Sequence, residues 1–135
     1  MNPKQFLQLG SVVLIVVGVL GFLGVIGPTP SQSLFGPFWW FDPAENVAHT
    51  VLGVAALVAA YTFPVLWQRY LVMVVGALAL VVALYNLMGE VVLLGANLES
   101  PADLVLHLAV GAWALYSVFG EKKGAASAKP EAPSE

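Results

Sequence analysis

The chain has 135 residues, of which 59% are hydrophobic and 10% are charged, and it carries a formal net charge of −3 and no cysteine. One small soluble core cannot bury that much apolar surface, so we predict an integral membrane protein whose main partner is the lipid bilayer. The negative charge argues against a nucleic-acid partner, which would need a basic face. The absence of cysteine excludes disulfides, thiolate metal sites and thiol nucleophiles.

Four stretches are apolar enough to cross a bilayer, because about 20 helical residues span about 30 Å of hydrocarbon. They cover residues 5–27, 43–65, 70–95 and 101–119. The first resembles an export signal, but it is too long and lacks a convincing cleavage site, so we interpret it as a retained helix. Glycines at every third position from Gly18 onward favour close packing of this helix. We therefore expect an all-α bundle of four transmembrane helices.

The connection after the first span, GPTPSQSLFGPFWWF, combines helix breakers with a dense group of aromatic residues. Trp39 and Trp40 suit the headgroup region, where amphipathic rings anchor membrane helices. A docking surface for another subunit is the alternative interpretation.

The basic residues predict the orientation of the bundle, because lysine and arginine resist translocation. They lie at the N-terminus, between the second and third spans, and in the C-terminal tail: Lys4, Arg69, Lys122, Lys123 and Lys129. We therefore expect both termini on the cytoplasmic side of a bacterial cell membrane. Residues 1–120 would form the four-helix domain, and the small, polar composition of 121–135 predicts a disordered cytoplasmic tail.

The sequence contains an internal repeat. DPAENVAHTVLG at residues 42–53 matches SPADLVLHLAVG at residues 100–111, and the same offset aligns IVVGVL with MVVGAL further upstream. The chain is thus predicted to be two tandem helical hairpins, at about 12–62 and 70–120, related by a pseudo-two-fold axis along the membrane normal. This symmetry would place the two motifs at equal depth, facing the periplasm or exterior.

Each motif begins with a polar residue, proline, alanine and an acid, which is a start signal for a helix. Asp42 and Ser100 are predicted N-caps, and proline suits the first helical position. Glu45 and Asp103 can reach back to the cap's amide and lie at the positive end of the helix dipole. This capping role accounts for both acids, and a ligand role is the alternative.

The histidines of the motifs, His49 and His107, follow their acids by four residues and so lie about 9 Å inside the helix starts. The third span adds Asn86 and Glu90 on one helical face at a similar depth. Ionisable groups inside a membrane usually face the bundle interior. We therefore predict a buried polar cluster near the non-cytoplasmic side, made of His49, His107, Glu90, Asn86, Glu45, Asp103 and Asn46.

The stretch SLFGPFWWFDPAENVAHTVLGVAAL, with Asn46 three residues before His49 and Gly53 four after it, resembles a bacterial family of small four-span membrane proteins. That family carries a repeated Asn-x-x-His-x-x-x-Gly pattern and is catalogued as a domain of unknown function. The similarity covers residues 5–119, and the second copy departs from the pattern with Leu104 in place of the asparagine. The resemblance implies membrane residence and a four-helix fold, and it brings no assigned reaction.

The leading hypothesis for function is a non-enzymatic accessory or structural subunit, which packs against other membrane subunits or a second copy of itself. Its histidines would be satisfied by neighbouring acids and amides, since polar groups in lipid must be paired. We find no glycine-rich phosphate loop and no Ser-His-Asp arrangement, so an enzyme is not expected.

Two alternatives stay open at this point. His49, His107 and Glu90 could hold a metal ion, or the two imidazoles could ligate a haem-type tetrapyrrole, with a glycine one turn from each histidine leaving room for the flat ring. The same three residues could also form a relay for protons or a small solute.

Overall fold

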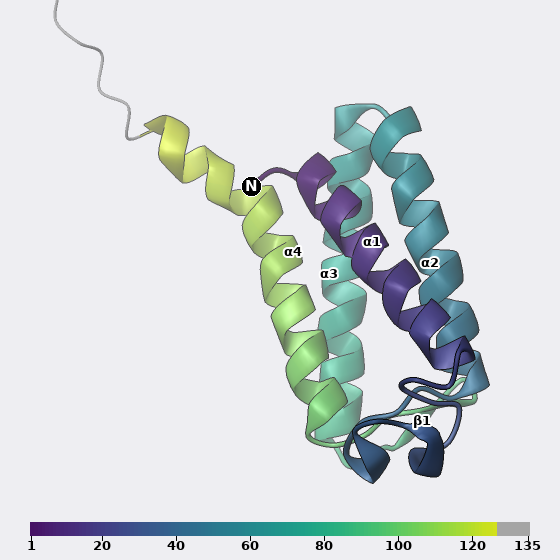
Figure 1. Cartoon of the computed structure of the whole chain (residues 1–135). Coiled ribbons are helices and arrows are strands. Elements are labelled where there is room, and N and C mark those ends of the chain that lie inside the picture. The colour runs from purple at the N-terminus through teal and green to yellow at the C-terminus, as the bar shows by residue number, and fades with distance from the viewer. Residues whose placement is uncertain (127–135) are drawn as a thin grey trace, which may run out of the picture.

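The computed structural model describes residues 1–126, which form four long helices and a pair of two-residue strands (Figure 1). The helices are α1 (Pro3–Phe22), α2 (Pro43–Thr62), α3 (Val65–Leu87) and α4 (Ala102–Ala126). All four are long and apolar enough to cross a membrane. The predicted class, an all-α bundle of four membrane-spanning helices, is therefore confirmed.

The third helix differs from the sequence prediction at both ends. It begins at Val65, because Pro64 ends α2 and only two residues separate the helices. It ends at Leu87, and Gly89 with a φ of 93° then turns the chain into the strands β1 (Val92–Leu93) and β2 (Ala96–Asn97). Hydropathy misses this ending because the chain stays apolar through the turn and the first strand.

Two smaller boundaries also change. The first helix ends at Phe22 rather than near residue 27, since the chain turns at Gly24, which has a φ of 74°. Helix α4 continues to Ala126, past the predicted domain boundary at residue 120. The rest of the predicted tail, 127–135, lies outside the described residues.

The helices pack as two hairpins, α1 with α2 and α3 with α4, and glycines lie at both crossings. A Cβ added to Gly53 would lie 2.7 Å from Cγ1 of Ile15 in α1. A Cβ added to Gly111 would lie 2.6 Å from Cδ2 of Leu80 in α3. These glycines hold equivalent places in the repeat, and each allows a close approach of the two helices in its own hairpin.

The bundle has two different ends. The N-terminus and the connection between α2 and α3 lie at what we call the basic end, together with Lys4 and Arg69. The starts of α2 and α4 lie at the opposite, motif end, together with the 23–42 and 88–101 connections, which gather at the bottom of Figure 1.

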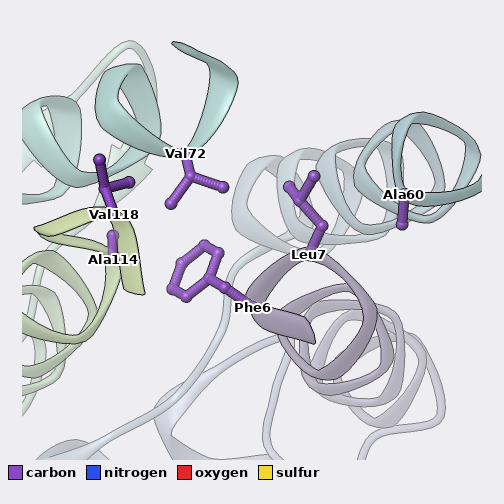
Figure 2. Close-up of a cluster of buried hydrophobic side chains, with 6 residues drawn as sticks. All are labelled: Phe6, Leu7, Ala60, Val72, Ala114 and Val118. Carbon is purple, nitrogen blue, oxygen red and sulfur yellow. The ribbon is translucent and has the colours of Figure 1, made fainter. Parts of the chain in front are cut away.

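The basic end is held by an apolar cluster to which every helix contributes (Figure 2). The Phe6 ring points between α3 and α4, where it meets the Trp113 ring edge-on at a centroid distance of 4.6 Å. The buried members are Phe6, Leu7, Ala60, Val72, Ala114 and Val118. Toward the middle of the bundle, a cavity of about 300 Å³ is lined by apolar side chains of all four helices.

Candidate functional site

At the motif end, α2 begins with the capping arrangement that the sequence predicts. The Asp42 side chain accepts a hydrogen bond from the Glu45 amide at 2.9 Å, and the Glu45 side chain accepts one from the Asp42 amide at 3.0 Å. Two amides that have no partner within the helix are thus satisfied.

Helix α4 begins differently. Ser100, the predicted cap, is exposed and makes no side-chain hydrogen bond within the described part of the chain, because α4 begins only at Ala102. Instead Asp103 reaches back one residue further, and its Oδ2 accepts a hydrogen bond from the Glu99 amide at 2.6 Å. The prediction for Ser100 is therefore wrong, while Asp103 does bind the backbone that precedes its helix.

Two hydrogen bonds connect the hairpins at this end. The Asn97 amide, on β2, donates to Oδ2 of Asp42 at 2.7 Å. The Trp39 indole, in the connection before α2, donates to Oδ1 of Asp103 at 3.3 Å. Asp42 and Asp103 therefore each also bind the opposite hairpin.

Three acids come together between the two helix starts. Glu45, Glu99 and Asp103 each offer a carboxylate oxygen, and these oxygens all lie within 4.8 Å of one another. Their side chains are 4%, 7% and 2% exposed. We call these three residues the carboxylate cluster.

Glu99 is a member of the carboxylate cluster that the sequence pattern does not indicate. The repeat aligns it with Phe41, so comparing the two copies gives no sign of a shared role. The one sequence feature that could have indicated a role for Glu99 is its position directly before Ser100, at the predicted start of the last helix. Burial and the neighbouring Asp103 carboxylate raise the pKa of Glu99 to about 7, while a hydrogen bond from the Asn97 side chain acts in the opposite direction.

The two histidines have the same local geometry. Nδ1 of His49 lies 2.8 Å from the Glu45 carbonyl oxygen, and Nδ1 of His107 lies 2.7 Å from the Asp103 carbonyl oxygen. Because a carbonyl can only accept, each Nδ1 carries the proton and donates, which leaves Nε2 with a lone pair. Both side chains are half-buried, and the Phe41 ring lies over His49 at a centroid distance of 4.7 Å.

The space beside the two motif glycines is already filled. Gly53 and Gly111 were expected to leave room for a flat ring, but Ile15 packs against the first and Leu80 against the second. The glycines therefore serve helix packing within the hairpins, and this argument for a tetrapyrrole no longer holds.

The two asparagines of the predicted cluster hold the connecting segments. Asn46 is fully buried beside Gly21 of α1, and its Nδ2 donates to the Phe41 carbonyl at 3.5 Å. Nδ2 of Asn86 donates to the Glu90 and Leu98 carbonyls, both at 3.3 Å.

Glu90 does not belong to the buried cluster. It follows the end of α3 and its side chain is exposed, and its backbone carbonyl is the part that Asn86 binds. Its predicted place on one helical face with Asn86 is wrong, because the helix ends between them.

Comparisons with protein-family models, curated proteins and solved structures found no match to this chain. The resemblance seen in the repeated motif therefore stays a prediction.

Proposed function

We propose that this chain is a non-enzymatic accessory or structural subunit of a bacterial cell membrane, with both termini cytoplasmic and the motif end on the periplasmic or exterior side. One observation carries this proposal. The polar groups of the two motifs bind the chain's own backbone and the opposite hairpin, as Asp42 does with Asn97 and Asp103 with Trp39. Such bonds stabilise the packing of two hairpins, which is the work of a scaffold.

The connecting segments at the motif end support a partner. Leu34, Met88 and Leu94 are 79%, 75% and 98% exposed, although they lie outside the four helices. Large apolar side chains in such a place favour contact with headgroups or with another protein. Phe35, which follows Leu34 in the chain, lines a groove of about 360 Å³ together with Phe38 and Val105. The partner class that fits is another membrane subunit or a second copy of this chain.

The partner can be tested with a photo-crosslinking residue at Leu94, in native membranes. We expect a discrete adduct, identified by mass spectrometry as a membrane protein or a second copy, and weakened by the charged substitution Leu34→Glu. A photo-crosslinking residue at Val74, an exposed position within α3, is the matched control and should label lipid. Lipid adducts alone at Leu94 would contradict the proposal.

The orientation can be tested with single cysteines, since the chain has none of its own. In intact cells, a membrane-impermeant maleimide should label Ser100→Cys at the motif end. It should label Thr62→Cys, at the other end, only after permeabilisation. Both positions are exposed. The reverse pattern would show that the predicted orientation is inverted.

Metal or tetrapyrrole binding by His49 and His107 is a second candidate, favoured by the lone pair that each Nε2 keeps. Absorbance near the Soret region and metal analysis of the purified protein test it, and a colourless, metal-free preparation would count against it. Transport receives less support, because Glu90 lies outside the cluster and the central cavity is apolar.

A further inference from the structure

In residues 1–120, whose side chains the structure describes, no lysine or arginine lies at the motif end beside the carboxylate cluster. The sequence contains no basic residue of either kind between Lys4 and Arg69, or between Arg69 and Lys122. Lys4 and Arg69 lie at the basic end, and 19 helical residues, or about 28 Å, separate Asp103 from Lys122. Three buried carboxylates therefore need either protons or a bound cation, since burying unpaired like charges is very costly.

A second observation concerns an unpartnered atom. Glu99 is 93% buried, being 7% exposed, and its Oε2 is enclosed without a hydrogen-bond partner in the described structure. Its Oε1 accepts a hydrogen bond from the Asn97 side chain. A buried carboxylate oxygen with no donor is a group that a cation would satisfy.

The geometry fits a calcium-sized ion. Ca²⁺ binds oxygen ligands at about 2.3–2.6 Å, so two ligands on opposite sides of the ion are about 5 Å apart. The three oxygens, all within 4.8 Å of one another, satisfy this limit. An all-oxygen donor set favours Ca²⁺ over Zn²⁺, and burial disfavours Mg²⁺, which keeps several of its waters.

We propose that Glu45, Glu99 and Asp103 form a Ca²⁺ site that joins the two hairpins at the motif end. Glu45 comes from the first hairpin and Asp103 from the second, so the bound ion would bridge them. This proposal does not depend on the accessory role, because the site is contained within one chain.

The test uses the whole protein, purified in detergent and stripped with EDTA. Equilibrium dialysis with radioactive Ca²⁺ should give one ion per chain, and Ca²⁺ should raise the Tm by several degrees. Tryptophan fluorescence is a suitable readout, since the Trp39 indole binds Asp103. Mg²⁺ should bind more weakly. Binding of Zn²⁺ in preference to Ca²⁺ would point to imidazole ligands and would overturn the assignment.

The ligand variant is Glu99→Gln, and the matched control is Glu90→Gln, an exposed acid at the same end of the bundle. We expect Glu99→Gln to weaken Ca²⁺ binding at least tenfold and to abolish the Tm shift, while Glu90→Gln keeps both. Glu45→Gln provides a second ligand variant if the first does not fold. The absence of saturable Ca²⁺ binding in the folded wild type would overturn the proposal and show that shared protons satisfy the cluster.

Discussion

The two ends of the bundle are held together by different chemistry. At the basic end, Phe6 and its neighbours from every helix form an apolar cluster, and the buried polar side chain of Gln68 nearby is uncharged. At the motif end, acids from two helix starts lie buried together, and hydrogen bonds to Trp39 and Asn97 join the hairpins. Apolar packing responds weakly to pH and ions, whereas a carboxylate cluster responds to both. The motif end is therefore where conditions outside the chain can change the structure.

The packing of the basic end is best tested with Phe6→Ala. We expect this variant to lose about 3 kcal/mol of unfolding free energy, the largest loss of the variants proposed, because a buried ring is replaced by a cavity. Reversible unfolding in mixed micelles measures this loss, which should be the same with Ca²⁺ or EDTA. The control is Leu9→Ala on the exposed side of α1, with little expected effect. A Phe6→Ala loss that depends on Ca²⁺ would mean that the two ends are not independent.

The crossing of α1 and α2 at Gly53 should be nearly as sensitive to substitution as the apolar cluster at the basic end. A methyl group on Gly53 would lie within 3.0 Å of α1 backbone and side-chain atoms, so we expect Gly53→Ala to cost about 2 kcal/mol. Gly10→Ala is the matched control, since no atom lies within 4 Å of the added Cβ. Thermal unfolding of both variants in one detergent would compare them. Equal stability of the two would contradict the close approach of α1 and α2.

A pH series in EDTA should affect the motif end alone. The ordinary pKa of Glu99 is 4.5 and its folded-state pKa is about 7, so between these values the unfolded chain loses its proton while the folded chain keeps it. Stability should therefore fall as pH rises from 4.5 to about 7 and then level off. The carboxylates of Asp103 and Glu45 also face the Glu99 side chain.

Glu99→Gln supplies the control for that series, because the amide does not titrate. The pH dependence of the Tm should become flatter in this variant, while Phe6→Ala should keep the full slope. If the pH dependence of the Tm is unchanged in Glu99→Gln, a group other than Glu99 causes it.

The smallest effect is expected for Trp39→Phe, which removes the indole donor to Asp103 and keeps an aromatic ring in place. A hydrogen bond of 3.3 Å to a carboxylate should contribute about 1 kcal/mol. Trp40→Phe is the control, as no hydrogen bond from its indole is found in residues 1–126. Thermal unfolding at fixed pH measures the difference between them. A larger loss in the control would show that ring packing matters more than this bond.

Local sequence rules predicted the helices and the first cap well. Apolar length was enough to identify four spans, and the Asp42-Pro43 start with Glu45 predicted a capping box that the structure contains. These features depend on interactions between residues that are close in sequence, so they can be predicted without knowledge of the fold.

The parts of the site that were missed depend on contacts between distant residues. Glu99 joins Glu45 only because two helix starts meet at one end of the bundle, and the repeat gave it no counterpart. Glu90 was placed in a helix because apolar residues continue beyond Leu87, where a turn at Gly89 ends the helical path. Hydropathy reports solubility in lipid and contains no information about such a turn.

The short connection between the hairpins has a mechanical consequence. Only Phe63 and Pro64 separate α2 from α3, so the hairpins cannot slide far along each other and can mainly splay about this point. The acids lie at the other end of the helices, about 30 Å away for 20 residues. A small rotation of the hairpins about the Phe63–Pro64 connection therefore displaces the acids more than residues closer to that connection.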